Sequence, residues 1–174
     1  MLIHMTTALI TRTDRTVPIT VFARTSAAPA TAFRIIAPID LTRVFLPFGP
    51  LPGVARVEGQ NAAWDRAGVS RSPVFTDGSR VTEALTEYVA GHGFAYELTG
   101  FTNVLARLAA GVRGEFSFLP DGTGTNIRWT YEFKPLRGRR AVIAGPFALL
   151  WRRYMRRALD RMVAVVEAPA IMEG

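Results

Sequence analysis

Residues 144–167, AGPFALLWRRYMRRALDRMVAVVE, decide the fold of this chain. Apolar side chains recur there at spacings of three and four residues, which is the period of one face of an α-helix. Arg152, Arg153, Arg156 and Arg157 fall on the opposite side of that helix, where we expect them to meet water. A helix of this length crosses a small domain from end to end and needs an apolar surface of equal length. The apolar positions are Phe147, Leu150, Trp151, Tyr154, Met155, Ala158, Leu159, Met162, Val165 and Val166.

Seven stretches before this helix have the composition and the short links of β-strands. They are residues 19–25, 54–61, 68–75, 79–89, 92–101, 111–119 and 125–135. Two short helices are predicted after the first strand, at residues 26–37 and 41–45, because Pro29 suits an early helical position and Asp40 can cap a helix. The predicted fold class is therefore α+β, with a seven-stranded sheet and a long C-terminal helix.

Alternation within the last three strands gives the sheet two different faces. Because an antiparallel sheet commonly buries one face only, we expect the aromatic face to carry the long helix. That face holds Phe94, Tyr96, Leu98, Phe116, Phe118, Trp129, Tyr131 and Phe133. The opposite face holds Glu97, Arg113, Glu115, Arg128, Glu132 and Lys134.

The length of 174 residues suits one domain with a full core. We expect a flexible N-terminal segment at residues 1–17, the domain at 18–168 and a short tail at 169–174. The chain has no cysteine, which excludes disulfides and thiolate chemistry. No run of eighteen apolar residues and no signal-peptide pattern are present, so we expect a cytoplasmic protein without integral membrane association.

The net charge of +7 comes from arginine rather than lysine and lies largely on the polar side of the last helix. No arginine–aromatic interleaving or nucleic-acid motif accompanies it, so we interpret it as a solvated helix face and expect no nucleic-acid partner. Peripheral membrane contact, and a monomer or a homodimer, remain open.

Several segments, in this order and spacing, resemble the SRPBCC superfamily (START and birch-pollen-allergen-like proteins), and look most like its polyketide cyclase/dehydrase-type branch. They are AAPATAF at 27–33, the run Trp64, Gly68 and Arg71, DGSRVTEALTEY at 77–88, FAYELTGF at 94–101 and GTGTNIRWTYEFKP at 122–135. The resemblance covers residues 19–167 and implies the helix-grip fold. In that fold a curved antiparallel sheet grips the C-terminal helix around a cavity for a hydrophobic small molecule.

A sheet that curves around one helix leaves an apolar cavity that the helix alone does not fill. For every residue that we expect in its walls, plain core packing is the alternative explanation. The expected wall residues are Phe33, Phe45, Phe48, Trp64, Val81, Leu85, Leu98, Leu105, Phe116, Phe118, Trp129, Phe147, Trp151, Tyr154 and Met155.

Two charged residues accompany the apolar side chains of the hairpin at residues 69–85. If residues 76–78 form a three-residue loop, Arg71 lies opposite Glu83; a two-residue loop would separate them. Such a pair either holds a substrate oxygen or is a structural ion pair. Tyr96 and Tyr131 add phenolic donors, so the candidate catalytic residues are these four. The sequence contains no metal-binding or cofactor-binding pattern, and we predict neither.

Two functions follow from these residues and the resemblance: a carrier or sensor for a lipid, polyketide or isoprenoid, or a cyclase/dehydrase-like enzyme in which Arg71, Glu83 or a tyrosine moves a proton. A third possibility is a protein or membrane partner that uses the apolar loops and the basic helix face. We also predict that the stretches 46–51 and 103–108 close over the cavity mouth, with Phe48, Val104, Leu105 and Leu108 at their tips. The alternative is that residues 104–108 are an amphipathic turn packed permanently on the domain.

Overall fold

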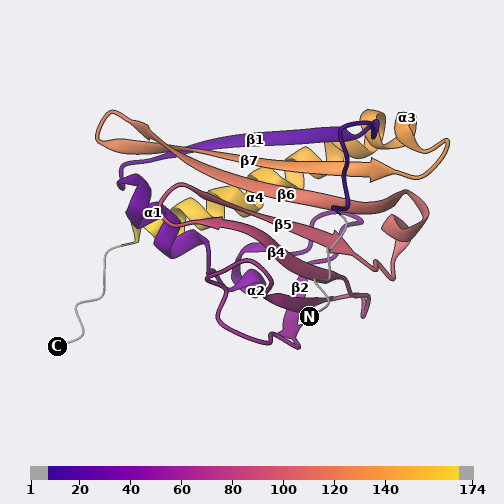
Figure 1. The fold of residues 1–174 in the computed structure, drawn as a ribbon, viewed down its shortest axis with the longest axis horizontal. Coiled ribbons are helices and arrows are strands. Elements are labelled where there is room, and N and C mark those ends of the chain that lie inside the picture. The colour runs from indigo at the N-terminus through magenta and orange to yellow at the C-terminus, as the bar shows by residue number, and fades with distance from the viewer. Residues whose placement is uncertain (1–7, 169–174) are drawn as a thin grey trace, which may run out of the picture.

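The computed structural model describes residues 8–168, and its centre is one seven-stranded antiparallel sheet in the order β1-β7-β6-β5-β4-β3-β2 (Figure 1). The prediction of seven strands is confirmed. The strands are β1 Val17–Thr25, β2 Val54–Glu58, β3 Ser70–Phe75, β4 Thr82–Val89, β5 Gly93–Thr99, β6 Ala109–Asp121 and β7 Gly124–Pro135.

The helices also follow the predicted α+β, helix-grip plan. Two short helices, α1 Pro29–Ile36 and α2 Leu41–Val44, follow β1, and the Asp40 side chain caps α2 by accepting from the Thr42 backbone N–H. A short 3₁₀ helix, η1 Val104–Arg107, precedes β6. The C-terminal region contains α3 Arg140–Val142, one wide turn η2 Ile143–Phe147, and the long helix α4 Ala148–Glu167. None of the helices within residues 8–168 is both long enough and apolar enough to cross a membrane.

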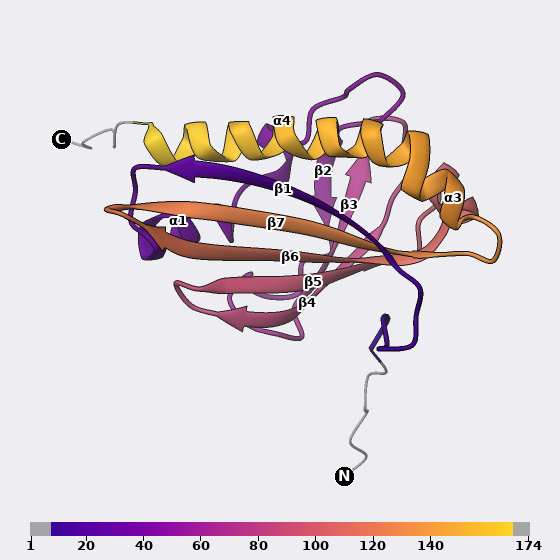
Figure 2. The ribbon, with the colours of Figure 1, turned by 90° about the horizontal axis from the view of Figure 1, so that it is seen from above.

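Helix α4 lies along the sheet and buries its apolar side against the aromatic face, as predicted (Figure 2). The Trp151 ring meets Phe133 and Tyr131 edge-on, with centroids 5.5 Å and 5.6 Å away. Phe147 stacks on Trp151 at 5.4 Å. Aromatic pairs in these arrangements contribute more than the area they bury, which ties the helix to β7.

The start of this helix differs from the prediction of a continuous helix from residue 144. Gly145 has φ −98° and ψ −115°, which is not helical, so the chain kinks before α4 begins. Pro146 explains the kink, because proline disfavours a helical conformation at the residue before it.

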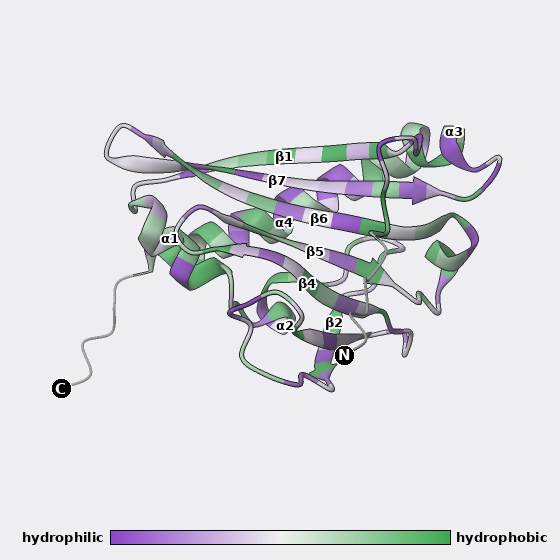
Figure 3. Cartoon of the chain, viewed as in Figure 1, coloured by the Kyte–Doolittle hydropathy of each residue, from purple (hydrophilic) through white to green (hydrophobic). Residues whose placement is uncertain are grey.

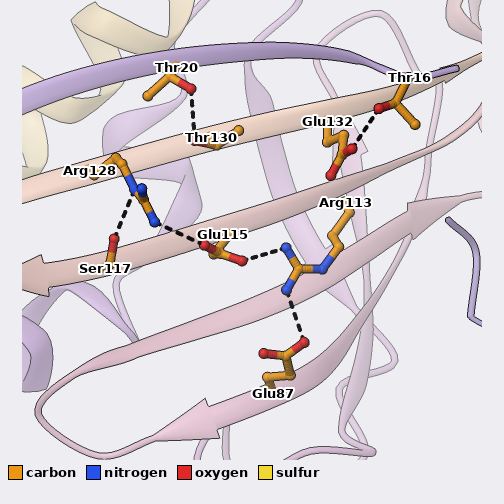
Figure 4. Close-up of polar contacts among 9 residues, drawn as sticks. All are labelled: Thr16, Thr20, Glu87, Arg113, Glu115, Ser117, Arg128, Thr130 and Glu132. Atoms are coloured by element: carbon orange, nitrogen blue, oxygen red, sulfur yellow. Dashed lines mark hydrogen bonds and ion pairs between the residues drawn. The ribbon is translucent and has the colours of Figure 1, made fainter. Parts of the chain in front are cut away.

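The outer face of the sheet carries the predicted charged side chains, and the alternation along the strands is visible in Figure 3. Arg113 bonds Glu115 on its own strand and Glu87 on β4, at 2.5 Å and 2.9 Å. Glu115 also accepts from Arg128 of β7 at 3.3 Å, so one network joins three strands (Figure 4).

Part of the predicted N-terminal segment lies along this outer face. The Leu9 backbone N–H donates to Glu97, and Lys134 binds both the Leu9 carbonyl and the Asp14 carboxylate. Residues 1–7 and 169–174 lie outside the described residues. The boundaries of the domain at 18–168 stay a prediction.

Candidate functional site

A cavity of about 240 Å³ lies between the inner face of the sheet, α4, the segment that leads from α1 to β2, and η1. All four polar candidates, Arg71, Glu83, Tyr96 and Tyr131, line it. The other predicted residues that line it are Phe45, Val81, Leu98, Leu105, Phe116, Trp129, Trp151 and Tyr154.

Seven predicted wall residues do not line this cavity. Leu85, Phe118 and Met155 are fully buried in the core, and Phe147 lies beyond Trp151 on Phe133. Phe33 and Trp64 lie in a separate depression beside α1. The Arg157 guanidinium lies over the Phe48 ring, and its Cζ is 4.6 Å from the centre of that ring. For Leu85 and Phe118 the physical reason is that alternation assigns a residue to a face of the sheet, whereas its position along the strand decides whether it meets the cavity. The other five are in helices and loops, where contacts with distant elements decide it.

The cavity also contains wall residues that the sequence reasoning did not select. Val112 and Phe94 carried a usable signal, because each is on the same strand face as a residue that was selected. Met162 carried one as well, since it shares the helix stripe of Trp151. Ile36 and Leu41 carried none, because only the tertiary fold brings α1 and α2 to the end of the sheet.

The ion pair between Arg71 and Glu83 is the most unusual feature of the wall. The two residues are register partners on β3 and β4, as the predicted three-residue loop requires, and the Phe75 N–H donates to the Ser79 carbonyl across that loop. The Arg71 Nε donates to Glu83 Oε2 at 2.6 Å, and each side chain is only 7% exposed. Of the two loop lengths left open by the sequence, the structure adopts the one that brings the two residues face to face.

Arg71 keeps unused hydrogen-bonding capacity. Its guanidinium lies over the Trp64 ring, 3.9 Å from the centre. Within residues 8–168, its one hydrogen bond is the bond from Nε to Glu83. A guanidinium has five N–H donors, so four remain for a ligand oxygen in the cavity that Arg71 lines.

Tyr96 lies on β5, next to the β4 strand of Glu83, and Tyr131 lies on β7, one strand further along the same face. The Trp129 indole N–H donates to the Tyr96 hydroxyl at 3.0 Å, and the two tyrosine rings meet edge-on at 6.0 Å. Gly114 lies between them in register, and a Cβ there would collide with the Tyr96 ring. The missing side chain therefore lets Tyr96 lie across β6.

Burial raises the pKa of both tyrosines well above the ordinary value, and the nearby Glu83 carboxylate raises each pKa further. Their hydroxyl groups therefore stay protonated at neutral pH, and they can donate hydrogen bonds to a ligand. In contrast to a tyrosinate, they are not ready to accept a proton. Among the four polar candidates, the group suited to accept a proton is the Glu83 carboxylate.

The two predicted mouth stretches meet the cavity only in part. Pro50 and Leu51 line it from one side, and Val104 and Leu105 line it from the other, whereas Phe48 and Leu108 do not. Val104 is 62% exposed and Leu105 is buried, because residues 104–107 form a 3₁₀ turn. The Tyr154 hydroxyl donates to the Pro52 carbonyl at 2.7 Å and so ties the first stretch to α4. Gating by these stretches stays a prediction.

No group of three or more histidine, aspartate and glutamate side chains within residues 8–168 is arranged to hold a metal ion. The charged, amide and phenol side chains that line the cavity are Arg71, Asp77, Glu83, Tyr96, Asn103, Tyr131 and Tyr154.

Several solved structures share this fold. Ara h 8.0201 is 13% identical with a TM-score of 0.66, covering 87% of this chain and 97% of that chain. Norcoclaurine synthase from Thalictrum flavum, in complex with dopamine and hydroxybenzaldehyde, is 14% identical with a TM-score of 0.66, covering 88% of this chain and 87% of that chain. A protein from Arthrobacter aurescens is 17% identical with a TM-score of 0.63, covering 88% of this chain and 87% of that chain. At these identities the likeness shows the fold alone.

The comparison by sequence is more specific. No curated protein matches the chain. Residues 16–167, which include every strand and α4, match the family described as polyketide cyclase / dehydrase and lipid transport. The chain therefore belongs to that family, within the SRPBCC superfamily of helix-grip proteins.

Proposed function

We propose that the protein binds a hydrophobic small molecule with an oxygen acceptor, of lipid, polyketide or isoprenoid type, in the cavity between the sheet and α4. The observation that carries this proposal is the Arg71–Glu83 pair, buried in a mostly apolar wall with four arginine N–H groups unused. A carbonyl, enol or carboxylate oxygen would accept from Arg71 while the apolar part fills the space beneath Trp129 and Trp151.

Stability alone gives little reason for such a pair. Replacing a buried ion pair with apolar residues of similar volume is often neutral or stabilising, because desolvation cancels much of the attraction. Binding of a ligand to this charged pair would explain why it lies in the apolar wall. Tyr96 and Tyr131, with their hydroxyl groups held protonated, supply further donors on the same side.

The volume limits the size of the ligand. The cavity of about 240 Å³ is just below the range of about 300–1,000 Å³ that is usual for sites of drug-sized molecules. A ring system or a short chain fits this space, and a two-chain lipid is too large for it.

The second candidate function is a cyclase/dehydrase-like enzyme. It is favoured by the convergence of an oxyanion-binding arginine, a carboxylate and two protonated phenols on one wall. In this role Arg71 and Tyr96 would stabilise an enolate oxygen while Glu83 accepts the proton from the adjacent carbon. The synthase of the same fold, in complex with dopamine and hydroxybenzaldehyde, illustrates that this fold can host chemistry.

Native mass spectrometry of protein purified from its own host tests the proposal, because a retained ligand gives its mass directly. The wild-type protein should carry a small apolar molecule, and Arg71→Met should lose it. Arg113→Met, which removes an arginine from the outer face, is the matched control and should keep it. Equal retention by all three proteins would overturn the proposal.

Glu83→Gln separates the two functions once the ligand is known. If the protein is an enzyme, this variant should keep binding and lose turnover, because the amide accepts no proton. If it is a carrier, the ligand should leave wild-type protein chemically unchanged.

A further inference from the structure

The arginines of this protein are distributed unequally between ion-paired and unpaired positions. Outside α4, five exposed arginines have a carboxylate partner, as Arg24 has Asp121 and Arg56 has Glu58, and eight on several other elements have none within residues 8–168. On α4, four exposed arginines have no ion-pair partner within residues 8–168. These four, Arg152, Arg153, Arg156 and Arg157, are called the basic helix face below.

The basic helix face is costly for the helix itself. Arg152 and Arg156, and likewise Arg153 and Arg157, are four residues apart, so like charges are neighbours on the helix surface. Asp160 and Glu167 are the acidic residues on this side of α4, and both follow the cluster. An anionic surface laid against the helix would relieve this repulsion.

Apolar side chains accompany the charges. Leu149 is 62% exposed, and it precedes Arg152, Arg153 and Arg156 by three, four and seven residues, so it lies in the middle of their arc. The loop between α2 and β2 rises past α4 on the side away from the sheet (Figure 2). In that loop Leu46 is 41% exposed, and Phe48 packs under Arg157.

We propose that the basic helix face, Leu149 and the loop at residues 46–52 form a docking surface for an anionic lipid membrane. Guanidinium groups bind lipid phosphates in a bidentate manner, and leucine enters the interface beside them. These groups lie together along one side of α4, so a flat membrane surface laid along the helix would meet all of them. A nucleic acid would use the arginines but gains nothing from Leu149 and Leu46, and no aromatic side chain stands exposed on α4 for its bases.

The docking surface also adjoins the cavity. Trp151 and Tyr154 line the cavity from the inner side of the same helix, and Pro50 and Leu51 line it from the same loop. The ligand would therefore pass from the membrane to the cavity through a layer one helix and one loop thick. This last step rests on the proposed function, whereas docking is tested below with vesicles that contain no ligand, so the two can fail separately.

The test is sedimentation of the full chain with vesicles of phosphatidylcholine containing about 30 mol% phosphatidylglycerol at about 100 mM salt. We expect binding to these vesicles, loss of binding at about 500 mM salt, and none to pure phosphatidylcholine. Arg152→Gln/Arg153→Gln/Arg156→Gln should lower the partition coefficient about a hundredfold, since each basic residue near the surface contributes about fivefold. Leu149→Ser should lower it with all charges kept.

The matched control is Arg12→Gln/Arg15→Gln/Arg34→Gln, which removes the same charge from exposed positions off α4. It should bind within about threefold of wild type, since none of the lost charges belongs to the docking surface. An equal loss in both triple variants would mean that net charge alone attracts the protein, and would overturn the proposal. Tighter binding to a short duplex DNA than to the vesicles would overturn it in favour of a nucleic-acid partner.

Discussion

Two arginine–glutamate clusters stand on opposite faces of the same sheet. On the inner face, the Arg71 and Glu83 side chains are each 7% exposed. On the outer face, Arg113 and Glu87 are 23% and 63% exposed, and Arg113 shares its charge with Glu115 (Figure 4). Water screens the outer pairs, so each contributes little. Burying the inner pair costs desolvation free energy, and removing one partner leaves an unpaired buried charge. Because stability alone does not explain such a pair, its presence points to a function.

Breaking the inner pair should have the largest effect. Glu83→Leu leaves the Arg71 charge buried without its partner, and we expect the free energy of unfolding to fall by about 3–5 kcal/mol. Urea denaturation followed by circular dichroism measures this. A loss below about 1 kcal/mol would mean that the pair behaves like the outer ones, and the comparison would fail.

Removing both inner charges should separate stability from binding. Arg71→Met/Glu83→Leu replaces the pair with apolar side chains of similar volume, and we expect it to be within about 2 kcal/mol of wild type or more stable. The same variant should come out of its host without the retained ligand. Stability as low as that of Glu83→Leu would show instead that the pair is needed to fold.

Alkaline pH should destabilise the protein, because the buried tyrosines around the cavity resist losing their protons. Burial raises the pKa of Tyr96, Tyr131 and Tyr154 in the folded state, so the unfolded chain loses these protons first. Their contribution to stability is complete below about pH 10, the ordinary tyrosine pKa, and is lost as pH rises through the folded-state values. Tyr131→Phe should make stability fall less steeply above about pH 10, as thermal unfolding against pH measures. If stability falls with pH as steeply in Tyr131→Phe as in wild type, burial does not raise the pKa of Tyr131.

The outer network should give the smallest effect. Glu87→Gln removes one partner of Arg113 while Glu115 remains, so we expect a loss of about 0–1 kcal/mol in the free energy of unfolding. That loss should shrink further in high salt. Thermal denaturation at two salt concentrations measures it, and a loss near 3 kcal/mol would place this pair with the inner one.

The sequence was most informative where counting residues along the chain decides which side chains share a face or lie opposite each other. For the inner pair the question came down to the length of one loop, because Arg71 and Glu83 can be counted outward from residues 76–78, and the structure adopts the three-residue alternative. The strands and their two faces followed from alternation with a period of two. These are local rules, and the structure confirms both.

It was weakest where position along an element matters. Phe118 has the right face, but it meets Phe33 edge-on and stacks with Phe94, which stands between it and the cavity. Trp64 lies in a loop, and it reaches Arg71 from outside the cavity lining. Phe48 is in the expected loop and turns toward Arg157 on α4. Each of these outcomes depends on contacts between elements distant in the sequence, which no local pattern contains.

The glycine at position 114 bears on how proteins of this plan can diverge in the molecules they accept. It touches no ligand itself, yet the Tyr96 ring occupies the room that its missing side chain leaves. One added methyl group would force that ring off β6 and into the cavity, and would shrink a space of about 240 Å³. On the proposed function, position 114 is a size selector: a single substitution there, outside the polar wall, would restrict the protein to smaller molecules.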